Sequence, residues 1–235
     1  MPMRVTVRHV VDFGEERELV GDSLVTPTSW DALRTQTDGP FAVATTPEEL
    51  GRQADERPDI GARAELIDRW IRERSPADLV SYGVGAGVLE CWLERLSPDR
   101  RMALTEYAPQ TLEQLRELFP NREVVRHDLL MDPPLDVELH LFHRIDTELS
   151  NRQWRTVMEN FARCELLVVA TEITGFAAAA AAAAAAAVRA RIRNPRVTNA
   201  GWLRNRAAFE ALWRPTHNLE RLRFGDLHAW YLVPR

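Results

Sequence analysis

The chain has 235 residues, of which 45% are hydrophobic and 28% charged, and its formal net charge is −5. This length and composition are typical of a single compact α/β domain. The acidic balance provides no basic surface for nucleic acid, which disfavours DNA- or RNA-modifying functions. Neither a signal peptide nor an apolar run of about 20 residues is visible, so we expect a cytoplasmic protein without a membrane span.

The first 60 residues carry weak patterns. Residues 5–11 alternate in a way that predicts a strand, and residues 41–44 are a candidate for another. A helix is expected after Thr46, because a threonine cap, a proline and two acids follow the usual order of a helix start. We take residues 1–60 as an N-terminal extension that forms a lid or accessory element, and residues 61–235 as the main domain.

The periodicity is stronger after this extension. A helix that ends near Ser75 is predicted from one apolar face. That face consists of Leu66, Ile67, Trp70 and Ile71. A strand-like run at 78–82, a glycine loop and a helix-like run at 88–96 follow, and a second strand at 102–105 ends at Glu106.

The glycine loop is the most informative feature of the sequence. Its glycines are Gly83, Gly85 and Gly87. Glycine lets the backbone approach a ligand closely, and the N-terminus of the following helix carries partial positive charge. An acid at the end of the next strand, Glu106 here, is the usual partner of ribose hydroxyls in doubly wound sheets. Together these features predict a nucleoside-containing cofactor at the carboxyl ends of two neighbouring strands.

The remaining chain alternates between helix and strand patterns. Helices are predicted at 110–119, 150–161 and 202–213, and strands at 123–127, 137–142, 165–171, 218–224 and 227–232. Ser150 and Gln153 match a capping box at the start of the second of these helices. The last two strands are joined by the short turn Gly225-Asp226, so they must be antiparallel.

At this point the chain resembles the class I S-adenosylmethionine-dependent methyltransferases, over about residues 64–235. The matching residues are Gly83, Gly85, Gly87, Glu106, Asp128 and the strand end at 141–144. The resemblance implies an α/β fold with a Rossmann-like, doubly wound, mostly parallel seven-stranded sheet that ends in an antiparallel hairpin. An NAD-dependent oxidoreductase is disfavoured, because the dinucleotide fingerprint would place its third glycine at Val88.

The resemblance implies S-adenosyl-L-methionine as the cofactor. Its expected contacts are Ser81, Gly83, Gly85, Gly87, Glu106, Tyr107, Asp128, Leu129 and Phe142. Glu106 is expected to bind the ribose. Asp128 is expected to bind the adenine amino group, or alternatively to cap the turn that follows it. In this family an acid commonly stands where this chain has Ser81. A hydroxyl supplies no charge to an ammonium group, so either the cofactor affinity is lower or other groups hold the ammonium group.

Methyl transfer requires alignment of the nucleophile with the methyl group, and sometimes removal of the nucleophile's proton. The resemblance places the end of the fourth strand beside the reactive end of the cofactor. His143 is the candidate general base there, because imidazole titrates near neutral pH; the alternative is that it only packs beside the cofactor. Asp146 either orients His143 or the substrate, or is a solvated loop acid. No metal site is expected.

Residues 177–187 are eleven consecutive alanines. Alanine favours helix, but the run lacks the amphipathic pattern of a surface helix. Either the run is genuine, or, as we favour from the arginine-rich flanks, it stands for other residues written as alanine. The second explanation implies a mobile cover near the active site.

The leading hypothesis is an enzyme that methylates a small molecule at oxygen in bacterial secondary metabolism. All 30 basic residues are arginine, which fits a GC-rich genome. The alternative is a protein of this fold that binds the cofactor without methyl transfer, as a cyclase-like catalyst or a binding protein. The expected partner is a small-molecule acceptor rather than nucleic acid or a membrane, and the chain is either a monomer or a homodimer.

Overall fold

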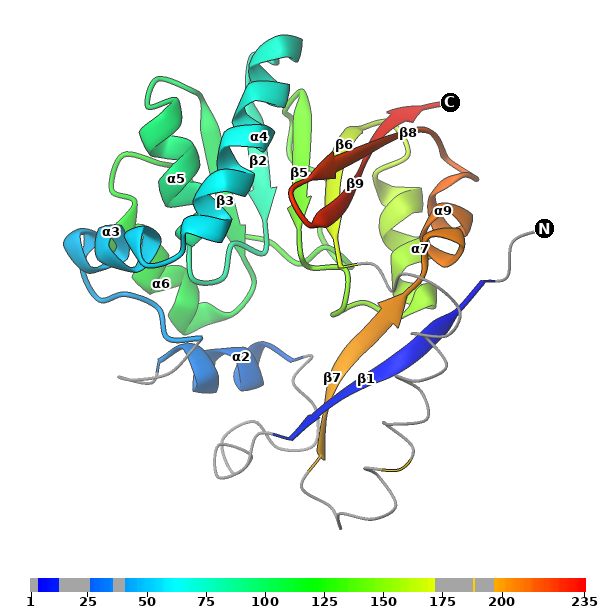
Figure 1. Cartoon of the computed structure of the whole chain (residues 1–235), viewed down its shortest axis with the longest axis horizontal. Coiled ribbons are helices and arrows are strands. Elements are labelled where there is room, and N and C mark those ends of the chain that lie inside the picture. The colour runs from blue at the N-terminus through cyan, green and yellow to red at the C-terminus, as the bar shows by residue number, and fades with distance from the viewer. Residues whose placement is uncertain (1–3, 13–25, 36–40, 172–187, 189–196) are drawn as a thin grey trace.

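The computed structural model describes residues 4–12, 26–35, 41–171, 188 and 197–235 (Figure 1). Its centre is a seven-stranded sheet in the order β4-β3-β2-β5-β6-β9-β8. Its strands are β2 (Leu79–Tyr82), β3 (Met102–Glu106), β4 (Val124–Arg126), β5 (Leu139–His143), β6 (Glu165–Ala170), β8 (His217–Phe224) and β9 (Leu227–Pro234). β2 to β6 are parallel to one another, whereas β9 is antiparallel to β6 and to β8. The predicted sheet and its closing hairpin are confirmed.

Helices cover both faces of this sheet. They are α3 (Pro47–Asp55), α4 (Pro58–Arg74), α5 (Val88–Leu96), α6 (Pro109–Leu118), α7 (Asn151–Asn160) and α9 (Arg206–Trp213), and a further helix, α2 (Pro27–Arg34), contacts the start of α6. One core cluster joins α3, α4, α5 and α6 to the sheet through residues such as Ile67, Leu93 and Leu115. The other joins α7 and α9 to the opposite face through Trp154 and Trp213. Neighbouring strand residues alternate between the two clusters, as the strand pleat requires.

The predicted helix ends have the expected chemistry. The Thr46 side chain accepts a hydrogen bond from the Glu49 N–H at the start of α3. Ser150 and Gln153 form a reciprocal capping box at the start of α7. α4 ends at Ser75, whose φ of 51° is left-handed and stops the helix.

Two sequence predictions are wrong. Residues 41–44 contain no strand. Residues 202–204 do not begin a helix but end β7 (Val197–Arg204), which pairs with β1 (Thr6–Asp12) in a separate antiparallel ribbon. The helix begins later because the Asn205 side chain caps it, accepting from the Ala208 N–H. The predicted first strand is thus confirmed, with a partner from far along the chain.

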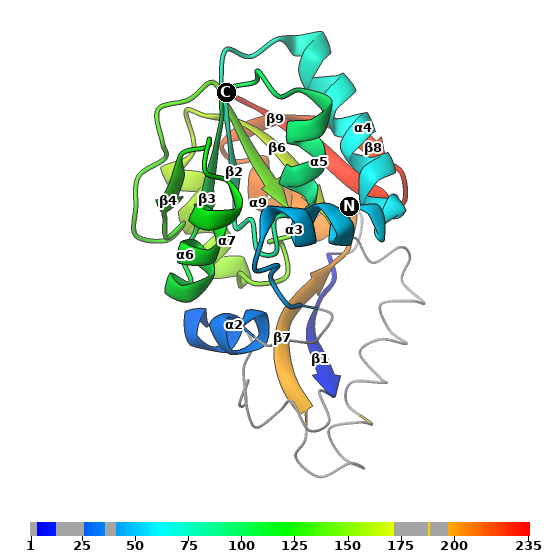
Figure 2. The same cartoon turned by 90° about the vertical axis from the view of Figure 1, so that its left-hand side faces the viewer.

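The N-terminal elements lie beyond the carboxyl ends of the parallel strands, where the figures place α2 and the β1–β7 ribbon (Figures 1 and 2). α2 is fixed there because the Asp31 carboxylate accepts from the Gln110 and Thr111 N–H groups at the start of α6. The ribbon is fixed by a bond from the Trp202 N–H to the Thr147 carbonyl, 2.8 Å long. Ala177–Ala187 lies outside the described residues, among which no helix is long and apolar enough to span a membrane.

Candidate active site

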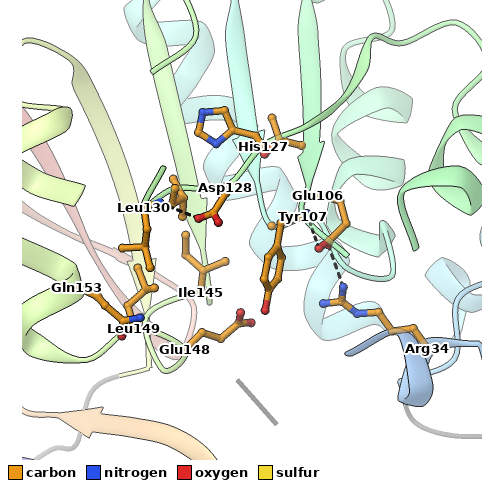
Figure 3. Close-up of a pocket in the computed structure, with 13 residues that line it drawn as sticks. Arg34, Glu106, Tyr107, His127, Asp128, Leu130, Ile145, Glu148, Leu149 and Gln153 are labelled. Carbon is orange, nitrogen blue, oxygen red and sulfur yellow. Dashed lines mark hydrogen bonds and ion pairs between the residues drawn. The ribbon is translucent and has the colours of Figure 1, made fainter. Parts of the chain in front are cut away.

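Two adjacent cavities lie at the carboxyl ends of β2, β3, β4 and β5. The first, of about 130 Å³, is the β4-side cavity (Figure 3). Its lining includes Thr105, Glu106, Tyr107, His127, Asp128 and Leu129. The second, of about 430 Å³, is the glycine-loop cavity. Its lining includes Gly85, Gly87, Glu90, His143 and Arg144. Arg34, Gly83, Ile145 and Glu148 line both cavities, so these four residues form the boundary between them.

Glu106 is the most completely hydrogen-bonded acid of the site. Its Oε1 accepts from the N–H groups of Tyr107 and Ala108, at 2.9 and 3.1 Å. Its Oε2 accepts from the Gly85 N–H at 3.1 Å and from Nη1 of Arg34 at 2.9 Å. Three of these four donors belong to the backbone, so the arginine is the donor that a ligand can replace without unfolding the strand end.

Arg34 fills the space between the glycine loop and Glu106. Its guanidinium lies 4.6 Å over the Trp30 ring, and its Nη2 would be 3.1 Å from a Cβ atom placed on Gly85. Figure 3 shows the side chain reaching from α2 to the carboxylate at the end of β3. A ribose hydroxyl can therefore reach Oε2 of Glu106 if Arg34 turns aside.

Glycine is needed at the three loop positions for different physical reasons. All have left-handed φ values, 65°, 65° and 75° in chain order. A Cβ on Gly83 would lie 2.7 Å from the Ile145 side chain, and one on Gly87 would lie 2.9 Å from Phe119. The three atoms nearest to a Cβ on Gly85, at 3.1, 3.5 and 3.8 Å, all belong to the flexible Arg34 side chain. Core packing therefore requires the outer two glycines, whereas the middle one keeps the cavity wall open to a ligand.

Asp128 makes the turn contact that the sequence left open as the alternative to adenine binding. Its Oδ1 accepts from the Leu130 N–H at 2.9 Å, which is a local turn contact. The residue also lines the β4-side cavity beside Tyr107 and Leu129. His127 lines the same cavity, and its Nε2 lies 3.0 Å from the Pro133 carbonyl.

Ser81 and Phe142, two of the residues expected to contact the cofactor, lie in the packed part of the sheet. Both are fully buried and line neither cavity. Ser81 Oγ donates to Oε1 of Glu90, 2.7 Å away, while Phe142 packs against Tyr82 and Phe161. The reason is the strand pleat, which turns these side chains towards the helices that cover the sheet.

The two candidate catalytic residues have different surroundings. His143 lines the glycine-loop cavity, and its Nε2 is buried without a hydrogen-bond partner among the described residues. Burial lowers the pKa of His143 to about 3, with Arg63 and Arg144 adding to the effect, so its imidazole is neutral. Asp146 lines neither cavity; its Oδ2 accepts from the Thr171 N–H at 3.2 Å. Because it is 1% exposed, the alternative of a solvated loop acid is wrong.

Three residues of the site were missed by the sequence analysis: Arg34, Glu90 and Glu148. Burial raises the pKa of Glu148 to about 7, an effect that the Arg34 guanidinium opposes. Burial likewise raises the pKa of Glu90 to about 7. A signal for α2 was present, since Thr26 caps the helix by accepting from the Ser29 N–H. No sequence pattern marks the two glutamates, because tertiary packing buries Glu90 and half-buries Glu148.

No protein-family model matches the chain, and no curated protein matches it in sequence. Solved structures match its fold. PigF with S-adenosylhomocysteine matches with a TM-score of 0.62 and 16% identity, over 95% of this chain and 66% of PigF. Human N-acetylserotonin methyltransferase with S-adenosylmethionine matches with a TM-score of 0.57 and 14% identity, over 80% of this chain and 55% of the human protein. An O-methyltransferase family protein from Burkholderia thailandensis matches with a TM-score of 0.54 and 13% identity, over 96% of this chain and 64% of that protein.

The chain thus spans between about half and two thirds of the length of these three proteins. At such low identity the comparisons bear on the fold, and they agree with the strand order and the closing hairpin. The chain has the Rossmann-like fold of the class I S-adenosylmethionine-dependent methyltransferases.

Proposed function

We propose that the protein is an S-adenosylmethionine-dependent methyltransferase that acts on a small molecule. The observation that carries the proposal is the pair of adjacent cavities at one end of the sheet. The smaller contains an acid held against a glycine loop, and the larger, of about 430 Å³, leaves room for an acceptor beside His143 and Glu148. Ligands of open α/β sheets bind at this end of the strands.

The residues present fit the cofactor. Glu106 would bind the ribose hydroxyls after Arg34 turns aside, and Asp128, Leu129 and Tyr107 would surround the adenine. Gly85 gives the cofactor its close approach to the backbone, because the atoms nearest to its missing side chain belong to the flexible Arg34. When bound, S-adenosylmethionine supplies an electrophilic methyl group on a sulfonium sulfur.

The acidic side chain at the boundary of the two cavities is suited to receive the acceptor's proton. A general base works best when its pKa lies near the working pH, and the pKa of Glu148 is raised to about 7 by burial. His143, whose pKa is lowered to about 3, is a weak base. We assign proton removal to Glu148 and positioning of the acceptor to the neutral imidazole. A need for proton removal supports a hydroxyl acceptor and therefore O-methylation.

The N-terminal extension is proposed to cover the site. Its residues Trp30, Arg34 and Phe41 line the glycine-loop cavity, and a cover keeps water from a reactive methyl donor. Bacterial secondary metabolism, a cytoplasmic location and a homodimer remain proposals that rest on composition and on the resemblance.

Calorimetry followed by a transfer assay tests the proposal. The purified chain is titrated with S-adenosylmethionine, S-adenosylhomocysteine and NAD, and then incubated with methyl-labelled cofactor and a panel of phenols, carboxylic acids and amines. The proposal is supported if S-adenosylmethionine and S-adenosylhomocysteine both bind and the labelled methyl group appears in one of the acceptors. Binding without transfer across the panel favours the second candidate, a cofactor-binding protein without methyl transfer. Binding of NAD alone contradicts both.

A further inference from the structure

The glycine-loop cavity contains a buried carboxylate to which no role has been assigned so far. Glu90 lies in the first turn of α5, three residues after Gly87, and it is 2% exposed. It lines the cavity together with the loop glycines. Its Oε1 accepts a hydrogen bond from Ser81 Oγ at 2.7 Å, which fixes the carboxylate beside the end of β2.

This carboxylate has no ion-pair partner among the residues that the structure describes. A buried carboxylate without a cation is costly, and the N-terminus of α5 offsets part of this cost. Burial raises the pKa of Glu90, and the nearby Glu106 adds to this effect. Groups of this kind are over-represented at binding sites, where a cationic ligand supplies the missing partner.

We propose that Glu90 binds the ammonium group of S-adenosylmethionine and S-adenosylhomocysteine, with Ser81 as its positioning residue. This inference rests on the proposed function. It follows from the order of the groups along the two cavities: the adenosine end of the cofactor belongs with Glu106 and Asp128 in the β4-side cavity. The amino-acid end then reaches the glycine-loop cavity, which Glu90 lines and those two acids do not.

The other acid of that cavity is less suited to this role. Glu148 lies at the boundary between the cavities, and its pKa reflects the nearby guanidinium of Arg34, so it already has a cation close by. The presence of Glu90 also accounts for the serine at position 81. A carboxylate at position 81 would stand against that of Glu90, whereas a hydroxyl donates to it. The negative charge is thus carried by the helix instead of the strand.

The test compares two ligands in binding experiments. S-Adenosylhomocysteine has the ammonium group, whereas 5′-methylthioadenosine has the same adenosine and a sulfur atom but no amino-acid portion. Glu90→Gln keeps the shape and removes the charge. We expect this substitution to weaken the binding of S-adenosylhomocysteine at least about tenfold, while the affinity for methylthioadenosine changes less than about twofold. Glu94→Gln, on the same helix but paired with Arg122 at 2.8 Å, is the matched control and should change neither affinity.

An exchange variant guards against a folding defect in the single variant. Ser81→Asp combined with Glu90→Ser returns the acid to the strand, and it should recover most of the affinity for S-adenosylhomocysteine. Equal weakening of both ligands by Glu90→Gln, or no weakening of either, would overturn the proposal and assign Glu90 a structural role. If the unchanged protein binds methylthioadenosine and S-adenosylhomocysteine equally well, the ammonium site is wrong while the adenosine site stands. If it binds neither, the proposed function itself is wrong.

Discussion

Arg34 Nη1 lies 2.9 Å from Oε2 of Glu106, and the two side chains are 9% and 1% exposed. The contact joins helix α2, from the N-terminal extension, to the end of β3. The acid that is expected to bind the ribose is therefore held by an arginine from the proposed cover. Occupation of the site and the position of that arginine are coupled through one carboxylate oxygen.

Arg34→Met should raise the affinity for S-adenosylhomocysteine several-fold, as measured by calorimetry. The substitution keeps an unbranched side chain beside Trp30 but removes the group that competes for Oε2 of Glu106. The carboxylate retains its three backbone donors, so the protein should stay folded. A tenfold loss of affinity would mean instead that Arg34 itself contacts the cofactor.

The rate of methyl transfer should depend on the ionisation of Glu148. Burial raises the pKa of this group to about 7, and a base acts in its deprotonated form, so kcat measured at saturating cofactor should rise with pH through about 7 and then level off. Glu148→Gln should lower kcat roughly 100-fold or more and abolish this rise. His143→Asn should keep the rise, because the imidazole is already neutral. The opposite pattern would make His143 the base.

Glu90 should make stability depend on pH. Its pKa is raised to about 7 in the folded protein from an ordinary value of 4.5, so the folded state holds the proton more tightly than the unfolded state. Stability from this group is therefore present at low pH and lost as pH rises towards and above 7. Relative to the unchanged protein, Glu90→Gln should gain roughly 2 kcal/mol of unfolding free energy between pH 5 and pH 8. Urea unfolding at both pH values measures this gain, and a constant difference would contradict the assignment.

Two alanine substitutions in the glycine loop should differ in whether they mainly lower stability or mainly lower ligand affinity. Gly87→Ala should lower the melting temperature more than Gly85→Ala does, because its Cβ would lie 2.9 Å from the buried Phe119 ring. In Gly85→Ala the nearest atoms to the new Cβ belong to the flexible Arg34 guanidinium, so the substitution should cost about 1 kcal/mol for its left-handed φ but weaken the binding of S-adenosylhomocysteine more strongly. Calorimetry and thermal unfolding on both variants separate the two effects. Equal losses of affinity would mean that the middle glycine does not face the ligand.

Much of the fold was predictable because its signals are local. The helix at Val88–Leu96 begins where the glycines end, and the capping box at Ser150 marks the start of α7. The pairing of β1 with β7 was not predictable, because it joins Thr6 to Arg204, and nothing in either segment specifies the other.

The site was predictable at strand ends and unpredictable elsewhere. Glu106 ends β3 and Asp128 lies two residues beyond the end of β4, so strand register alone brings them to one cavity. The direction of a side chain within a strand end is harder to predict, which is why Ser81 was expected to face a ligand and instead faces Glu90. Arg34 reaches the site across 72 residues of sequence, through the docking of α2 on α6.

The central claim is that Glu106 and the glycine loop bind an S-adenosyl ligand, and calorimetry on a matched pair of variants tests it most directly. Glu106→Gln removes the charge that holds the ribose, while Glu113→Gln removes an exposed charge on α6. We predict that the unchanged protein and Glu113→Gln bind S-adenosylhomocysteine in about the micromolar range and do not bind NAD. Glu106→Gln should bind it at least about tenfold more weakly, since charge-assisted hydrogen bonds contribute roughly 1.5–3 kcal/mol each. Equal affinities in all three proteins, or binding of NAD in preference, would contradict the account.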